Sequence, residues 1–236
     1  MKQSLQSIGI WLVGIVLILV LFVVMAFLSL VLFPFDRKRK LVHAQCFWWT
    51  DAVTALNPYW DVQIGGLENI DPRRTYVVVS NHQSLADIVL MYKTKMQFKW
   101  VAKESLFKIP VLGWNLQLAR HIRLKRGDFS SIRKVYKEAG EWLNKKISVV
   151  FFPEGTRGNE EGTGEFQNGA FKLAIKEKVP VLPVLIQGTK NAIPKGSWKF
   201  TTKTSCVIKV LPPIETEAML SGDFIRLRDL AKAQLS

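Results

Sequence analysis

The chain has 236 residues, 48% of them hydrophobic, which suffices for one membrane segment and one soluble domain but excludes a second large domain. Lys and Arg number 33 against 19 Asp and Glu, and the formal net charge of +14 favours polyanionic partners: nucleic acid, an anionic membrane surface or small phosphorylated molecules. The two cysteines, Cys46 and Cys206, stand far apart without a CxxC motif or a His/Cys cluster, so neither a disulfide framework nor a zinc site is expected.

Residues 1–40 are expected to form a membrane anchor with a basic flank. From Ile8 to Phe33 the sequence is apolar apart from two glycines and one serine, and a helix of this length, about 39 Å, can cross a bilayer. A cleaved signal peptide would have a shorter apolar region preceded by several positive charges, but here only Lys2 precedes the run and four cations follow it at 37–40. The positive-inside rule therefore predicts a retained segment of the inner or cytoplasmic membrane, spanning it or bent within one leaflet, with the remaining chain on the cytoplasmic side.

Residues 41–58 have a roughly helical apolar pattern that is rich in tryptophan. An amphipathic helix at the lipid interface, where Trp rings are favoured, would have this pattern. A helix whose Trp48 and Trp49 pack on the following domain would have it too, and the sequence leaves both interpretations open.

Residues 59–236 predict one α/β domain. Strands are expected at 60–64, 76–79, 98–102, 122–124, 147–152, 179–186 and 207–211, and helices at 84–92, 110–117, 129–143, 168–176 and 224–235. This alternation predicts a largely parallel or mixed sheet covered by helices. Pro110 is expected at the first position of its helix. Pro183 cannot donate to a sheet ladder, so 179–186 is expected to be an edge or interrupted strand that is suited to forming a hydrophobic wall.

The segment Asn-His-Gln-Ser-Leu-Ala-Asp at 81–87 follows the strand 76–79 and enters a helix. With His82 in the turn and Asp87 in the first helical turn, the carboxylate can hold one imidazole nitrogen and leave the other to accept a proton from an alcohol. The pair could also merely close the turn. The other histidines are poorer bases, because His43 has no acidic neighbour close by and His121 stands between two arginines that disfavour its charged form.

Two further segments carry groups suited to a phosphorylated ligand. The strand 147–152 runs into Pro153-Glu154-Gly155-Thr156-Arg157, which offers a carboxylate for hydroxyl groups, approachable backbone amides and a guanidinium that matches phosphate. Alone, this run could be a solvated turn. Residues 120–128 place four cations around two apolar residues, which fits an anion-binding segment or a short strand with outward-facing charges.

In this order and spacing, Asn81-His82 with Asp87, then 152–157, then 179–184 resemble the 1-acylglycerol-3-phosphate O-acyltransferase family of glycerolipid acyltransferases. The resemblance covers residues 76–188 and makes 59–236 the catalytic domain. It implies that His82 is a general base and Asp87 its orienting partner. It also assigns a group of residues to the glycerol-phosphate site, namely Glu154, Gly155, Thr156 and Arg157.

Two other family segments are matched less closely. The family's Ile-Asp-Arg motif falls on 124–126, which gives Arg126 a phosphate-binding role, whereas Lys125 departs from the pattern and leaves room for a different acceptor head group. Residues 103–114 are similar to the family segment that precedes this motif. The residues there with an expected acyl-chain or structural role are Phe107, Pro110 and Gly113, and Pro183 is assigned the same role.

The resemblance implies transfer of a fatty acyl group from acyl-CoA or acyl carrier protein to the sn-2 hydroxyl of 1-acylglycerol-3-phosphate (lysophosphatidic acid), which gives phosphatidic acid. Direct transfer is expected, without an acyl-enzyme, metal or redox cofactor, because a Gly-x-Ser-x-Gly motif is absent and neither Cys neighbours a His. Oxyanion donors are expected among the amides near Ser84 or in a neighbouring cation. The alternatives are transfer to another lysolipid and a non-catalytic adaptor that binds membrane lipids. Nucleic-acid binding is not expected, because the basic residues are scattered and no nucleic-acid-binding motif appears.

Overall fold

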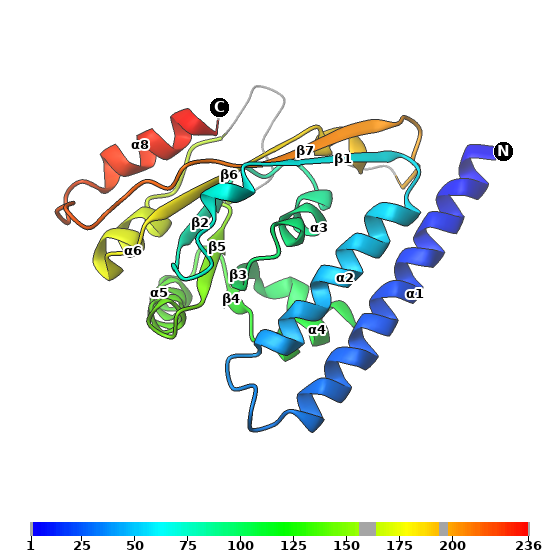
Figure 1. Ribbon diagram of the computed structural model, residues 1–236, viewed down its shortest axis with the longest axis horizontal. Coiled ribbons are helices and arrows are strands. Elements are labelled where there is room, and N and C mark those ends of the chain that lie inside the picture. Colours follow the sequence, from blue (N-terminus) through cyan, green and yellow to red (C-terminus); the bar gives the residue numbers. More distant parts are fainter. Residues whose placement is uncertain (1, 156–163, 194–197, 236) are drawn as a thin grey trace.

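The computed structural model describes residues 2–155, 164–193 and 198–235. In these residues the centre is one mixed sheet with strand order β1-β7-β6-β2-β5-β3-β4 (Figure 1). Neighbouring strands run parallel except β6 and β7, which are antiparallel. The strands are β1 (Trp60–Gly65), β2 (Val77–Ser80), β3 (Phe98–Lys103), β4 (Ile122–Leu124), β5 (Ser148–Phe151), β6 (Val181–Gln187) and β7 (Thr204–Val210).

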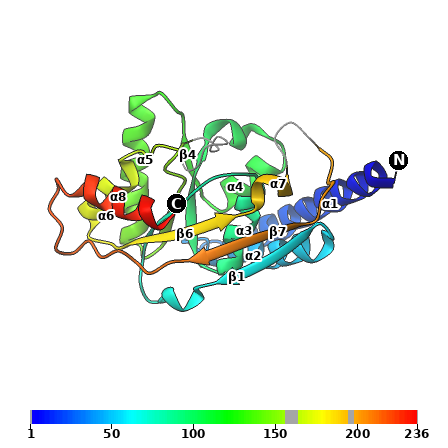
Figure 2. The same cartoon turned by 90° about the horizontal axis from the view of Figure 1, so that it is seen from above.

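Helices cover both faces of this sheet (Figures 1 and 2). Helices α5, α6 and α8 pack on one face, whereas α2 and α3 pack on the other, with α1 against α2. The α-helices are α1 (Lys2–Val31), α2 (Lys40–Leu56), α3 (Ala86–Met91), α4 (Leu112–Leu118), α5 (Phe129–Asn144), α6 (Gly169–Glu177), α7 (Thr189–Ala192) and α8 (Phe224–Gln234). Short 3₁₀ helices lie at Leu67–Asn69, Tyr92–Thr94 and Glu104–Lys108.

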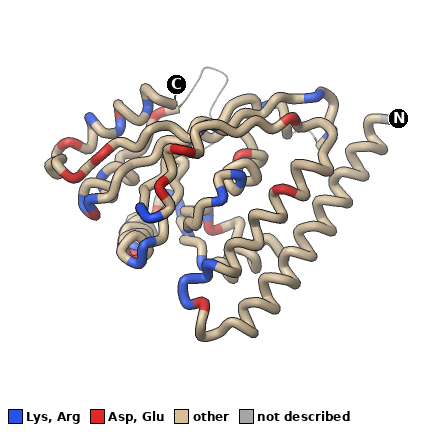
Figure 3. The backbone as a smooth tube through the Cα atoms, viewed as in Figure 1, with Lys and Arg blue, Asp and Glu red and all other residues tan. Residues whose placement is uncertain are grey.

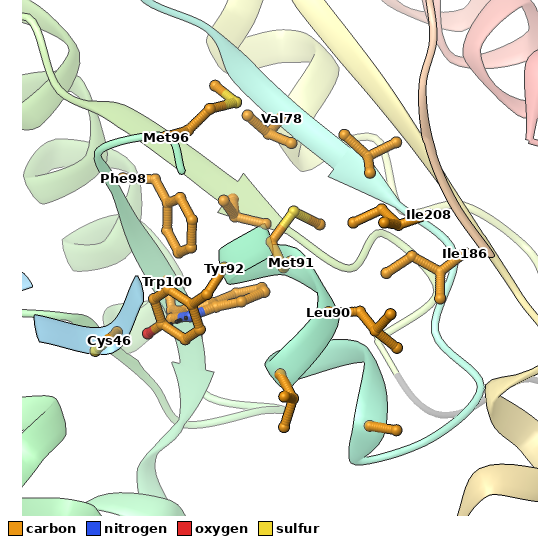
Figure 4. Close-up of a cluster of buried hydrophobic side chains, with 14 of the residues drawn as sticks. Cys46, Val78, Leu90, Met91, Tyr92, Met96, Phe98, Trp100, Ile186 and Ile208 are labelled. Carbon is orange, nitrogen blue, oxygen red and sulfur yellow. Dashed lines mark hydrogen bonds between the residues drawn. The ribbon is translucent and has the colours of Figure 1, made fainter. Parts of the chain in front are cut away.

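Strand β2 lies in the middle of the sheet and is buried on both faces. Val77 and Val79 belong to the apolar cluster under α5 and α6, whereas Val78 belongs to the cluster under α2 and α3. Burial on both faces explains why this strand is a continuous apolar run and not an alternating one. In the second cluster, Phe98 and Trp100 of β3 lie beside Tyr92 (Figure 4). Strand β2 is therefore packed on both faces of the sheet.

The predicted fold class, an α/β domain with a largely parallel or mixed sheet behind an apolar helix, is confirmed. The suggestion that 179–186 is an edge strand is wrong, since β6 lies between β2 and β7. Strand β6 itself is continuous from Val181 to Gln187, and only its pairing on the β7 side is interrupted. The ladder to β7 ends at Val184. Beyond it the carbonyl of Pro183 accepts from the amide of Leu211 at 2.9 Å, and Val181 forms an isolated bridge with Ile214, which follows β7 in the chain.

Pro110 does not open its helix, which was a wrong prediction. Helix α4 begins at Leu112, after a turn in which Val111 has a φ of 62°. A right-handed helix requires negative φ, so the positive φ of Val111 separates Pro110 from the helix. The turn also brings Gly113 so close to the preceding 3₁₀ helix that a Cβ there would clash with the backbone of Phe107. The chain must therefore bend before the helix begins.

Helices α1 and α2 run side by side along one edge of the molecule (Figures 1 and 2). Helix α1 is long and apolar enough to cross a membrane, and 11% of its most apolar window is buried. The segment predicted to be amphipathic is helix α2, whose Trp48 and Trp49 are partly buried against the core. The packing interpretation of these tryptophans therefore has direct structural support.

Candidate active site

The His–Asp turn, residues 81–87, leaves the carboxyl end of β2 and enters α3. Its first residue, Asn81, is clamped onto β6: the side-chain amide donates to the carbonyl of Ile186 at 2.7 Å and accepts from the amide of Ile186 at 2.9 Å. Asn81 is buried, so these bonds are shielded from water. The start of the turn is thereby fixed to a neighbouring strand.

His82 and Asp87 are paired. The ring Nδ1 of His82 lies 2.7 Å from Oδ2 of Asp87, and because a carboxylate only accepts, the proton is on Nδ1. The Asp87 side chain is fully buried, whereas that of His82 is 15% exposed and lines a cavity. The expected contact between the two side chains is therefore present, and Nε2 is the nitrogen left to meet a ligand.

The carboxylate of Asp87 also organises the turn around it. Its Oδ2 accepts from the backbone amides of Gln83 at 2.6 Å and Ser84 at 2.8 Å. These two amides are thus already engaged by Asp87, so an oxyanion donor among the amides near Ser84 would have to be another amide at the start of α3. The other expected donor, a neighbouring cation, is available at the cavity, as described below.

The ring of His82 is fixed by stacking. It lies parallel to Phe152 with ring centres 4.1 Å apart, and Phe152 in turn stacks on Trp100 at 5.3 Å. Stacking on one face together with the bond to Asp87 sets both the plane and the rotation of the imidazole. Its orientation is therefore built into the fold.

Glu154 joins the loop after β5 to the His–Asp turn. One carboxylate oxygen accepts from the amide of His82 and the other from the amide of Gly164, each at 3.0 Å. Gly155, with a φ of 70°, adopts a left-handed conformation that favours glycine and lines the cavity. Thr156 and Arg157 lie outside the residues that the structure describes.

The cavity beside His82 has a volume of about 470 Å³ and is mostly apolar. Its walls come from α1, α2, α3, β3 and α4, and Gly14 and Ile18 of α1 are among the lining residues. Its polar groups include His82 and the cations Lys103 and Arg126. The space can hold a hydrocarbon chain with a polar end near the imidazole.

Lys103 was not singled out from the sequence, although it lies at the carboxyl end of β3 and pairs in register with Leu124 of β4. Parallel strands bring such ends together, which was the available signal. Lys125 does not line the apolar cavity. It forms an ion pair with Asp128 at 3.4 Å and faces a separate polar hollow.

The residues expected to have an acyl-chain or structural role are not among those that line the cavity. Their neighbours Leu106, Leu112 and Leu116 line the cavity instead. The expected residues that do not line the cavity are Phe107, Pro110, Gly113 and Pro183. Among them, Gly113 permits the close contact between α4 and the preceding 3₁₀ helix.

The other two histidines are unsuited to proton transfer at neutral pH. Burial lowers the pKa of His43 to about 3 and lowers that of His121 well below its usual value. For His121 the largest cause is burial, followed by His43 and Lys99, and not the flanking arginines that the sequence suggested. His82 is therefore the histidine placed to act as a base.

Charge is distributed unevenly over the chain (Figure 3). The apolar helix α1 carries no acidic or basic residue after Lys2, and four cations follow it at 37–40. Arg120 ties this basic segment to the domain by donating to the carbonyl of Arg37 at 3.1 Å. Apolar and cationic surfaces thus adjoin at the turn after α1.

This arrangement places the chain in the class of α/β proteins that carry a His–Asp pair at the carboxyl edge of a sheet, beside an apolar cavity. A family model described as Acyltransferase matches residues 61–187. The chain belongs to this acyltransferase family.

Similar proteins support the assignment. A chloroplast 1-acyl-sn-glycerol-3-phosphate acyltransferase of Brassica napus is 39% identical over 165 residues, 69% of this chain and 47% of that protein. The alpha form of the mouse enzyme of the same name is 32% identical over 71% of this chain and 60% of its own length. The chain thus spans about half the length of the curated relatives it matches.

A solved structure covers almost the whole chain. The crystal structure of the 1-acyl-sn-glycerophosphate acyltransferase PlsC from Thermotoga maritima matches with a TM-score of 0.83 and 29% sequence identity. The match covers 99% of this chain and 95% of that one. The similarity therefore includes α1 and α2 as well as the α/β domain.

Proposed function

We propose that the chain transfers a fatty acyl group from a thioester donor to the sn-2 hydroxyl of lysophosphatidic acid, giving phosphatidic acid. The observation that carries the proposal is the His82–Asp87 pair, joined at 2.7 Å, beside an apolar cavity that Lys103 and Arg126 also line. The names of the matched relatives support the same reaction. Both acyl-CoA and acyl carrier protein fit as donors, since both are anionic and the chain is basic.

In the proposed mechanism His82 acts as general base and then as general acid. Nε2 accepts the proton of the acceptor hydroxyl while the hydroxyl oxygen attacks the thioester carbonyl carbon. Asp87 stabilises the imidazolium that forms. The carbon–sulfur bond then breaks, the thiolate takes the proton from Nε2, and the free thiol and the acylated acceptor leave as products.

A covalent acyl-enzyme has no place in this mechanism. Burial raises the pKa of the Cys46 thiol to about 12 and that of Cys206 to about 11, so both thiols are protonated and weakly nucleophilic at neutral pH. No metal or cofactor is needed for any step. Direct transfer is therefore the simplest route.

We assign the cations to the phosphate of the acceptor and the apolar cavity to the transferred acyl chain. Lys103 and Arg126 line the cavity together with His82, and guanidinium and ammonium groups bind phosphate oxygens well. A lipid hydroxyl next to a bound phosphate would then lie within reach of the imidazole. The departure of Lys125 from the family motif does not oppose this assignment, because Lys125 faces away from the cavity.

The packing of α1 argues for an embedded position in one leaflet of the cytoplasmic membrane. Helix α1 forms a wall of the cavity and contacts α2 and α4. If α1 crossed the membrane perpendicular to its plane, the domain packed along α1 would be carried into the bilayer with it. The exposed apolar face of α1 would contact lipid, and the cations at 37–40 would meet anionic head groups on the cytoplasmic side. Impermeant reagents should then label cysteines placed at Leu5 and Phe35 from the same side, whereas labelling from opposite sides would indicate a span.

The proposal is tested by supplying the purified full chain with lysolipids of different head groups and with each donor. Mass spectrometry identifies the product, and release of free thiol measures the rate. Phosphatidic acid formed with matching thiol release supports the proposal. Transfer only to another lysolipid would show that the acceptor is that lipid and not lysophosphatidic acid. Lipid binding without thiol release would indicate a non-catalytic adaptor.

A further inference from the structure

The carboxylate of Asp87 is held by two different parts of the chain. Its Oδ2 accepts hydrogen bonds from His82, Gln83 and Ser84, all within the His–Asp turn. Its Oδ1 accepts from the hydroxyl of Thr189 at 2.5 Å, a residue 102 positions away in α7. One oxygen therefore depends on local structure, and the other depends on a distant segment.

The corner between β6 and α7 brings Thr189 to this position. Gly188 has a φ of 79°, and a Cβ there would clash with the backbone carbonyl of Ser205 in β7, so the corner requires glycine. Thr189 follows directly and is fully buried. Its side chain does not line the cavity, so a bound substrate would not touch it.

The segment that runs from β6 into α7 therefore supports both ends of the His–Asp turn. Asn81 at the start of the turn is bonded to Ile186, and Asp87 at its end is bonded to Thr189, three positions further along the chain. If the hydroxyl of Thr189 is removed, Oδ1 becomes a buried charged acceptor that has lost this partner. The carboxylate would then rotate or recruit another donor, and the direction of its bond to His82 would change.

The hydroxyl of Thr189 has one proton and two acceptors nearby. It lies 2.5 Å from Oδ1 of Asp87 but 3.4 Å from Oε1 of Gln83, so the proton is donated to Asp87. A charged acceptor also makes the stronger bond.

We propose that Thr189 is a positioning residue for acyl transfer, which fixes the plane of the Asp87 carboxylate and thereby the direction of Nε2 of His82. The inference rests on the proposed function, because it assigns Thr189 a part in the same proton transfer. A purely structural role would instead affect folding stability without a selective effect on turnover.

The test compares Thr189→Val, which removes the hydroxyl at nearly constant shape, with Thr189→Ser, which keeps it, in the full chain in detergent. Loss of a hydrogen bond to a charged group should lower kcat by about tenfold to a hundredfold in the Val variant, with KM for donor and acceptor changed by less than about threefold. The Ser variant should keep kcat within about threefold of the unmodified chain.

Thr216→Val is the matched control. Thr216 is also buried, and its hydroxyl donates to the carbonyl of Val179 at 2.8 Å, away from the His–Asp turn. This variant should lower the unfolding temperature by an amount similar to Thr189→Val but leave kcat unchanged. An equal loss of kcat in both Val variants would overturn the inference, as would normal kcat in Thr189→Val or equally slow Ser and Val variants.

Two further results keep the outcomes separate. If Thr189→Val fails to fold by circular dichroism, Thr189→Cys supplies a weaker donor of similar size. Its kcat should fall below that of Thr189→Ser, and a kcat equal to that of the unmodified chain would reject the positioning role. If the unmodified chain transfers no acyl group to any lysolipid, the proposed function itself fails. If the unmodified chain is active and the Thr189 variants are equally active, only the inference about Thr189 is rejected.

Discussion

Replacing Gly14 by leucine should shorten the acyl chain that the protein prefers. Gly14 lies on α1 and lines the apolar cavity, and a Cβ added there would have no neighbour within 4 Å. A leucine side chain can therefore start from this position without a clash at its Cβ and extend into the cavity. If the transferred acyl chain occupies this space, the far part of a long chain loses its place.

The size of the effect follows from the hydrocarbon that is displaced. A leucine side chain fills the space of about four methylene groups, and each buried methylene contributes about 0.8 kcal/mol. Since about 1.4 kcal/mol corresponds to a tenfold change, each excluded methylene should lower kcat/KM about fourfold. The longest chain that fills the cavity should lose about two-hundredfold, whereas chains too short to reach Gly14 should be unaffected.

The assay measures kcat/KM with donors of increasing acyl length, using Gly9→Leu as the control. Gly9 lies on the same helix, a Cβ added there also has no neighbour within 4 Å, and Gly9 does not line the cavity, so leucine there should leave the length profile unchanged. An unchanged profile for Gly14→Leu would refute the assignment of the cavity to the acyl chain. The same shift in both variants would attribute the effect to α1 in general.

Three other substitutions test the phosphate site and the buried histidine. Arg126→Ala should lower kcat/KM about tenfold to a hundredfold by raising KM for the acceptor. Lys125 lies outside the cavity, so Lys125→Ala should change kcat/KM less than about threefold. If Arg126→Ala changed only KM for the donor, the assignment of Arg126 to the acceptor phosphate would be contradicted. His43 is buried with a pKa of about 3 against 6.5 when unfolded, so the unfolded chain binds more protons between these values and stability rises with pH across that window. His43→Leu should lower this slope, measured by denaturant unfolding, by up to about 1.4 kcal/mol per pH unit. An unchanged slope would exclude a contribution from His43.

The pairing of His82 with Asp87 could be predicted because the two residues are close in sequence. A histidine in the turn after a buried strand and an aspartate in the first turn of the next helix are near enough to meet, and the amides of Gln83 and Ser84 lie in the same turn. The buried strands were also recognisable, because β2 and β5 are continuous runs of apolar and β-branched residues.

Contacts that depend on the order of strands could not be predicted. Glu154 meets the amide of His82 across 72 positions, and Thr189 meets Asp87 across 102, because β5 and β6 both neighbour β2. The sequence pattern of a strand does not say which strands lie beside it. For the same reason Pro183 suggested an edge, although β6 lies between β2 and β7.

The rate of thiol release from acyl-CoA in the presence of lysophosphatidic acid, measured for His82→Ala, tests the central claim most directly. The His82 side chain is partly exposed at the cavity and its ring stacks on Phe152, so its removal should leave folding and membrane attachment intact. The account predicts a fall in turnover of about a hundredfold or more with an unchanged circular dichroism spectrum. A folded His82→Ala variant that transfers acyl groups at a near-normal rate would contradict it.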